Sequence, residues 1–221
     1  MIKTDRLRPA LLACGLLSSV LYVSADIFAA ARYPGYDYTS QAISEMSAIG
    51  APTANLLAPI YTLYSILFAL FGAGVWLAAG GRRSLRASSI FLIAIAALGI
   101  GWAIFPMNAR GTERTLTDTM HLAMGGTSSL FIIGAIVCGA AAFGRKFRIY
   151  SAATVLVMLA FGYVMSMDVP RVATNMPTPY LGITERLMMA AWLLWMAVFS
   201  VKLLSEHRIP AVRLRLQKGS E

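Results

Sequence analysis

Ionisable side chains stand near the ends of apolar segments of this sequence, where they could bind a polar ligand. Asp26 is the clearest case, because an acidic group in an apolar segment generally faces a polar partner or water and not lipid. Gly15, Ser19 and Tyr22 precede it at spacings of three or four residues, which puts all four on one face of a helix. This face is predicted to point into a helix bundle. The alternative is that Asp26 merely reaches the headgroup region.

Asp118 and His121 form a second pair, three residues apart at the start of another apolar segment. On a helix, this spacing lets both side chains bind one metal ion, or lets the carboxylate orient the imidazole for acid or base catalysis. Zinc sites usually need three or four ligands, so carboxylates such as Asp26 would have to complete the site. A structural, hydrogen-bonded histidine is the alternative. We expect no cofactor, and a transition metal is the alternative expectation.

Glu185 and Arg186 open the last apolar segment, and Ser44 and Glu45 lie in a long stretch between the first two. Because neighbouring residues of a helix point in different directions, one member of the Glu185 and Arg186 pair should face inward. Helices of one bundle can converge at one membrane face. The predicted binding site therefore consists of Tyr22, Asp26, Ser44, Glu45, Asp118, His121, Glu185 and Arg186.

Two arginines, Arg110 and Arg114, add positive charge between the third and fourth apolar segments. Guanidinium groups suit a phosphate or a carboxylate. Ion pairs with Glu113 and Asp118 are the competing interpretation.

The elements that must position these residues are membrane-spanning helices. Of the 221 residues, 58% are hydrophobic and only 13% are charged, against about 25% charged in ordinary soluble domains. Only helices or closed barrels satisfy their backbone groups in lipid, and the alternating pattern of a barrel is absent from the sequence. We predict an all-α bundle, a single domain over 1–221, with six transmembrane helices at about 9–31, 54–79, 87–107, 118–142, 148–167 and 181–204.

The orientation follows from the basic residues, most of which lie near the two ends, near residue 82 and near residue 146. Positive residues close to a span are retained in the cytoplasm, which predicts that both termini are cytoplasmic and that 205–221 form a basic cytoplasmic tail. The net charge of +9 thus indicates topology and not nucleic-acid binding. The expected partners are membrane lipids.

The stretch between the first two spans contains a helix-like segment over 39–48, which Thr39 could cap and Gly50 with Pro52 would end. Its apolar residues recur at helical spacing. We predict a short extracytoplasmic helix that lies in the membrane interface. The alternative is a lid folded over the bundle.

Several motifs resemble a known family. They are Arg8-Pro9, Cys14-Gly15, Asp26, Tyr33-Pro34-Gly35-Tyr36-Asp37, Gln41, Ser44-Glu45-Met46-Ser47-Ala48-Ile49-Gly50-Ala51-Pro52-Thr53, Phe105-Pro106, Asp118 and His121. Together they resemble the bacterial membrane proteins catalogued as domain of unknown function 998, in which Leu is more frequent where Met46 stands. The resemblance covers essentially the whole chain and implies six helices, no assigned activity and a location in the bacterial cytoplasmic (inner) membrane. A weaker resemblance links the chain to the DRAM and Sfk family of lipid-associated membrane proteins.

Three functions are compatible with this sequence. The first is a multi-pass membrane protein whose outward polar pocket binds a lipid headgroup or a small solute. The second is a metal-assisted hydrolase or transferase acting on lipid, which the shortage of histidines and the lack of a nucleophile motif disfavour. The third is a small-solute transporter, which the lack of charged residues at mid-membrane depth and of an internal repeat disfavours.

Overall fold

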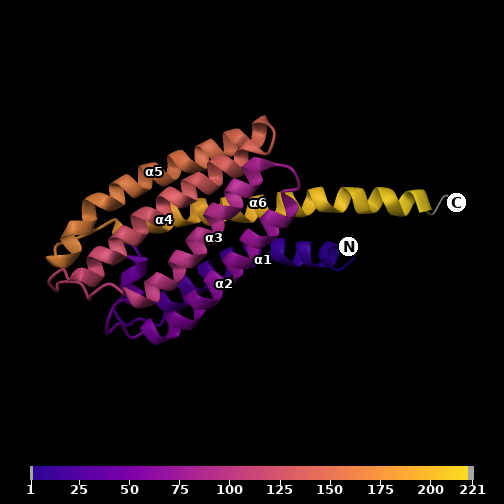
Figure 1. Ribbon diagram of the computed structural model, residues 1–221. Coiled ribbons are helices and arrows are strands. Elements are labelled where there is room, and N and C mark those ends of the chain that lie inside the picture. Colours follow the sequence, from indigo (N-terminus) through magenta and orange to yellow (C-terminus); the bar gives the residue numbers. More distant parts are fainter. Residues whose placement is uncertain (1, 219–221) are drawn as a thin grey trace.

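The chain folds into a bundle of long helices (Figure 1). The computed structural model describes residues 2–218 and the side chains of residues 7–206. Six helices are long and apolar enough to cross a membrane, and the described residues contain no strand. The elements are α1 (Ile2–Ala30), η1 (Ile43–Ser47), α2 (Ala54–Ala78), α3 (Arg83–Ile104), α4 (Leu116–Ala141), α5 (Arg145–Ala173) and α6 (Leu181–Lys218). The predicted multi-pass helical fold is confirmed.

Two helices extend beyond their predicted ends. α5 continues past residue 167 to Ala173, and Asp168 forms an ion pair with Arg171 one turn later, which lets charged residues remain on the helix. α6 continues past residue 204 as one helix to Lys218. The side chains after residue 206 lie outside the described part of the chain, so the basic tail remains a prediction.

Each helix packs against the next one in sequence, and α6 returns to pack against α1. Gly74 brings α2 close to α1, because a Cβ atom there would lie 2.9 Å from the backbone of Leu11. Trp192, Trp195 and Phe199 of α6 are fully buried in the core that the other helices surround. Both termini lie at one end of this bundle (Figure 1). We call the opposite end, formed by residues 31–53, 105–115 and 174–180, the far end.

The predicted helix over 39–48 is wrong: only the five-residue 3-10 helix η1 forms there. In an α-helix capped by Thr39, the first intrahelical bond would run from the Ile43 amide to the Thr39 carbonyl. Here the Ile43 amide donates to the Glu185 carboxylate at 2.7 Å, and the Thr39 carbonyl accepts from the Ile183 amide at 3.0 Å. Ile43 and Met46 are buried against α1 and α2. Residues 31–53, which we call the capping loop, therefore fold over the end of the bundle.

Candidate functional site

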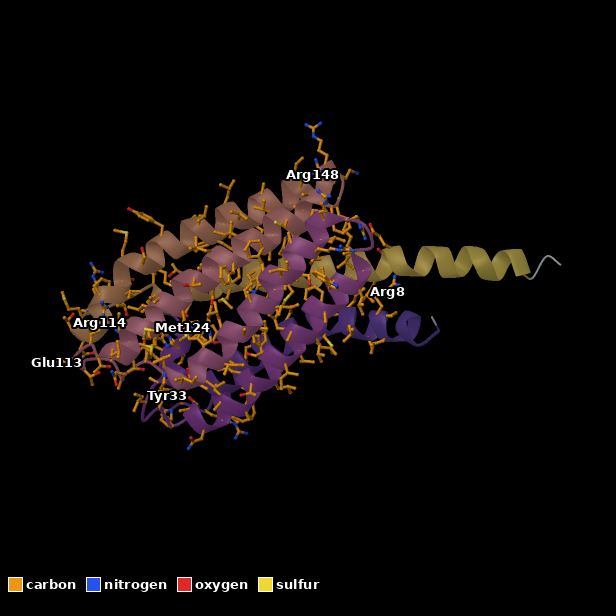
Figure 2. All side chains as sticks on the ribbon, in the orientation of Figure 1. Arg8, Tyr33, Glu113, Arg114, Met124 and Arg148 are labelled. Atoms are coloured by element: carbon orange, nitrogen blue, oxygen red, sulfur yellow. The ribbon has the colours of Figure 1, made fainter. Side chains whose placement is uncertain are left out.

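The three connections at the far end are hydrogen-bonded to one another. The Ile49 amide donates to the Met107 carbonyl at 2.9 Å, the Thr178 hydroxyl donates to the Ser40 carbonyl at 2.8 Å, and the Ile183 amide donates to the Thr39 carbonyl at 3.0 Å. Figure 2 shows Tyr33, Glu113 and Arg114 gathered at this end, far from Arg8. The capping loop is thus fixed on both sides.

Asp26 and Arg186 form a buried, bidentate ion pair between α1 and α6. The Arg186 Nη2 and Nε atoms donate to the two Asp26 oxygens at 2.9 and 3.1 Å. Asp26 is 5% exposed and Arg186 8% exposed. Arg186 is therefore buried, Asp26 faces a partner and not lipid, and the half-buried Glu185 also faces the protein.

The remaining Arg186 donors bind the capping loop. Nη1 donates to the carbonyls of Tyr38 at 2.8 Å, Gln41 at 3.2 Å and Gly182 at 3.2 Å, and Nη2 donates to the Tyr36 hydroxyl at 2.8 Å. The guanidinium carbon lies 3.6 Å from the centre of the Tyr38 ring, which favours a cation–π contact. A guanidinium has five N–H donors, and all of those on Arg186 have an acceptor. This side chain holds the loop in place.

Two tyrosines complete the same network. The Tyr38 hydroxyl donates to Asp26, and the Tyr36 hydroxyl donates to the carbonyls of Gln41 and Ala42. Burial raises the pKa of Tyr36 and of Tyr38, and the adjacent carboxylate of Asp26 raises the pKa of Tyr38 further. Both hydroxyls thus remain protonated donors at neutral pH.

Gly182 and Glu185 bring α6 against the capping loop. A Cβ atom at Gly182 would collide with the carbonyl oxygens of Gln41 and Tyr38, so only glycine permits this close approach. The Glu185 carboxylate accepts from the Ile43 amide at 2.7 Å. Glu185 thus binds the backbone at the start of η1.

Glu45 and Arg110 form a second bidentate ion pair, between η1 and the 105–115 connection. Nη2 and Nε of Arg110 donate to the Glu45 oxygens at 2.7 and 2.9 Å. The Glu45 side chain is 4% exposed and that of Arg110 18% exposed. The same carboxylate accepts from the Ala42 amide and, at 3.4 Å, from the Gln41 amide group.

Asp118 and His121 organise the 105–115 connection instead of joining Asp26. The Asp118 carboxylate accepts from the Asn108 amide at 2.8 Å and from the Thr115 amide at 2.9 Å, the second bond being half of a capping box for α4. His121 Nδ1 lies 3.0 Å from the Phe105 carbonyl oxygen, and its ring packs edge-on against Trp102. The described residues contain no group of three or more His, Cys, Asp or Glu side chains that could hold a metal ion.

Tyr22 and Ser44 are the remaining predicted site residues. The Tyr22 ring packs against Tyr61 and Tyr64, with ring centres 5.9 and 5.2 Å apart. Ser44 is half-buried in η1, and its carbonyl accepts from the Ser47 hydroxyl at 3.2 Å. The structure therefore brings Asp26, Glu185 and Arg186 together beneath the capping loop, to which Glu45 itself belongs, whereas Asp118 and His121 belong to a neighbouring local network.

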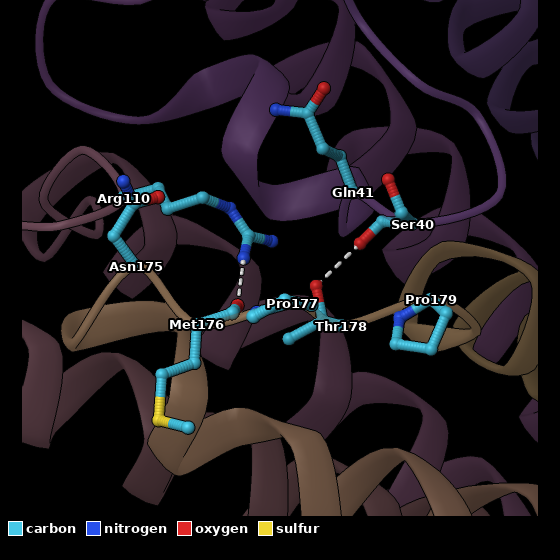
Figure 3. Close-up of a pocket in the computed structure, with 8 residues that line it drawn as sticks. All are labelled: Ser40, Gln41, Arg110, Asn175, Met176, Pro177, Thr178 and Pro179. Atoms are coloured by element: carbon cyan, nitrogen blue, oxygen red, sulfur yellow. Dashed lines mark hydrogen bonds between the residues drawn. The ribbon is translucent and has the colours of Figure 1, made fainter.

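Two cavities open at the far end, and both are lined by Gln41 and Arg110. The first has a volume of about 350 Å³ and lies between these residues and the Asn175 to Pro179 segment, as Figure 3 shows. The second has a volume of about 380 Å³ and is lined on its other sides by Tyr33, Glu45 and Ala109. The residue types and spacing did not identify Gln41 or Asn175 as lining a cavity. Gln41 was noted only among the residues that resemble the family, and Asn175 was not noted at all.

Comparisons with known proteins identify a family but no activity. A family model described as a protein of unknown function (DUF998) matches residues 16–202. No curated protein and no solved structure matches the chain. The weaker resemblance to the DRAM and Sfk family remains a prediction.

Proposed function

The chain belongs to the DUF998 family, whose function is unassigned, and we propose from its far end that it binds a lipid headgroup or a small solute there. The supporting observation is the pair of cavities that meet at Gln41 and Arg110. Their volumes of about 350 and 380 Å³ fall within the usual range of ligand sites. A cavity with convergent polar groups is the ordinary form of such a site.

The rigidity of the surroundings supports the same proposal. The capping loop is held by Arg186 and by Glu185, so the cavity walls are positioned before a ligand arrives. A site formed in advance loses less conformational entropy on binding. The ion pair of Asp26 and Arg186 acts in this proposal as a support, since its donors are already occupied.

We further propose that the far end faces away from the cytoplasm. Arginines stand at both short connections of the opposite end, Arg82 within the first and Arg145 directly after the second, and positive residues beside spans favour the cytoplasmic side. The termini then lie in the cytoplasm, and the cavities open toward the outer headgroup region. The bacterial inner membrane is the proposed location.

The test uses cavity-filling variants of the full chain in lipid nanodiscs. Ala109→Trp adds bulk at the second cavity and Ser40→Trp adds it at the first, so each should displace a ligand without removing a charge. Leu116→Trp is the matched control, because Leu116 is uncharged, 73% exposed and lines neither cavity. Native mass spectrometry and thermal unfolding would be recorded against a panel of phospholipids, neutral lipids and small solutes. Binding that survives both cavity-filling variants would contradict the proposal.

A further inference from the structure

We infer that the cavity between Arg110 and Met176 binds a phosphate-type oxyanion, with Arg110 as its charged donor. This inference rests on the proposed function and names the ligand chemistry of one of the two cavities. The same oxyanion occurs in a phospholipid headgroup and in a free phosphate ester, and the experiment separates these sources.

The charge of the lining favours an anion. Arg110 carries the only full charge among the eight lining residues labelled in Figure 3, and none of the eight is Asp or Glu. The partner carboxylate of Glu45 belongs to the lining of the other cavity. Arg110 lines both cavities, but only the second also has the Glu45 carboxylate in its lining, so the first contains the guanidinium without an acidic side chain. An oxyanion gains from a guanidinium that is partly shielded from water.

The hydrogen bonds of Arg110 leave donors for a ligand. Nε and Nη2 bind Glu45, while Nη1 donates to the Met176 carbonyl at 3.5 Å, the outer limit of a hydrogen bond. Within the described part of the chain, these three bonds account for fewer than the five N–H groups of a guanidinium. Arg186 differs, because each of its donors has a close acceptor. Of Arg110 and Arg186, Arg110 is thus the one that can bind an added oxygen ligand.

Polar groups around Arg110 can supply further hydrogen bonds. Ser40 and Asn175, two of the lining residues, carry a hydroxyl and an amide, whereas the Gln41 amide group is already bonded to Glu45 and to the backbone of Asp37. Asn175 has a φ of 54°, a left-handed conformation that Asn tolerates better than most residues. The lining therefore combines one cation with neutral groups that can donate.

The position of the cavity favours a phospholipid as the source. Met176 is 54% exposed and Tyr180 is 62% exposed beside the cavity mouth, directly before α6. Exposed tyrosines next to a membrane span mark the headgroup level. A phosphate at this depth can remain attached to lipid chains that lie along the helices.

The experiment compares Arg110→Lys with the wild type in the full chain. Lysine keeps a positive charge beside Glu45 but loses the fork of donors that reaches into the cavity. Three probes are used. Binding of inorganic phosphate is measured by calorimetry in a non-ionic detergent. Binding of phosphatidylglycerol and of phosphate-free diacylglycerol is measured by native mass spectrometry. Arg114→Lys is the control, because Arg114 is exposed and outside the lining. We expect Arg110→Lys to weaken phosphate-type binding by about tenfold or more, the effect of losing charge-assisted hydrogen bonds, and the control to leave it unchanged.

A second variant distinguishes a loss of ligand binding from a loss of folding. Asn175→Asp adds a carboxylate to the lining without touching the Glu45 and Arg110 pair, and Asp also tolerates a left-handed backbone. It should weaken binding of the oxyanion while thermal unfolding stays close to that of the wild type. Binding that is equal in wild type, Arg110→Lys and Asn175→Asp would overturn the inference.

The pattern across probes separates the remaining outcomes. Binding of both inorganic phosphate and phosphatidylglycerol indicates an oxyanion site open to free ligands, and binding of phosphatidylglycerol alone indicates a headgroup site. If the protein prefers diacylglycerol or an uncharged solute, and Ser40→Trp still abolishes this binding, the inference fails while the proposed function stands. If no member of the panel binds the wild type, both fail.

Discussion

Removing the charge of Asp26 should destabilise the whole far end. In an Asp26→Asn variant, Arg186 stays 8% exposed and loses its ionic partner. Breaking a buried ion pair by removing one partner typically costs about 3–5 kcal/mol, because the other charge remains buried. Arg186 retains the carbonyls of Tyr38, Gln41 and Gly182 as acceptors. We therefore expect a loss near the lower limit, about 3 kcal/mol.

The matched control is an exposed ion pair at the opposite end. Arg82 and Glu206 lie 3.0 Å apart with side chains 38% and 41% exposed. Solvent screens such a pair, and its removal costs about 0–1 kcal/mol. Glu206→Gln makes the same chemical change of carboxylate to amide as Asp26→Asn does, so the comparison isolates burial.

The assay is reversible unfolding in mixed micelles, followed by tryptophan fluorescence. Trp192 and Trp195 are 1% and 0% exposed in the core, so their emission reports the loss of the bundle. A coupling free energy between Asp26 and Arg186 follows from the double variant Asp26→Asn with Arg186→Gln. The reasoning is refuted if Asp26→Asn costs no more than Glu206→Gln, or if the two far-end changes are additive.

Three further results are expected. Gly182→Ala should loosen the capping loop, seen as faster proteolysis of the loop, because the new methyl group collides with two loop carbonyls; Gly126→Ala, where a Cβ atom meets nothing within 4 Å, should have no such effect. Reporter fusions next to Arg82 should indicate cytoplasm and those next to Tyr36 the outside, and the opposite result would reverse the proposed orientation. Burial raises the pKa of Tyr36 above the ordinary 10.0, so the unfolded chain loses this proton first and stability falls as pH rises through 10; Tyr36→Phe should reduce that slope, and an equal slope in both proteins would show that Tyr36 is not buried in solution.

Hydropathy predicted the spans because length and apolar content alone decide whether a helix can cross lipid. The predicted starts at residues 54 and 181 match those of α2 and α6. The ends of the helices were harder to predict where charged residues extend a helix beyond its apolar part. Asp168 and Arg171 satisfy each other on α5, so the polar segment remains helical although its composition indicated an end.

The form of the capping loop could not be read from its own residues. Its helical spacing of apolar side chains is real, and Ile43 and Met46 are buried as a helix would require. The hydrogen bonds that prevent an α-helix include one from the Ile43 amide to Glu185, which lies 142 residues away. No local pattern contains that information.

The acidic residues also differ in whether their partners could be predicted from the local sequence. Thr115 and Asp118 have the spacing of a capping box, so the structural role of Asp118 was readable from the sequence although we also considered a metal. The pairing of Asp26 with Arg186 was not readable, because it joins the first and last spans. Whether a carboxylate caps its own helix or binds a distant arginine depends on tertiary structure.

Arg186 and Arg110 should be separable by experiment, because their donors are used differently. Every donor of Arg186 has an acceptor, so a ligand could reach the pair with Asp26 only by displacing the capping loop. Arg110 already faces a cavity and needs no such movement. Changes at Arg186 should therefore lower stability together with binding, whereas Asn175→Asp at the Arg110 cavity should lower binding at nearly constant stability. A protein in which both changes had the same effect would contain one structural network and no ligand site.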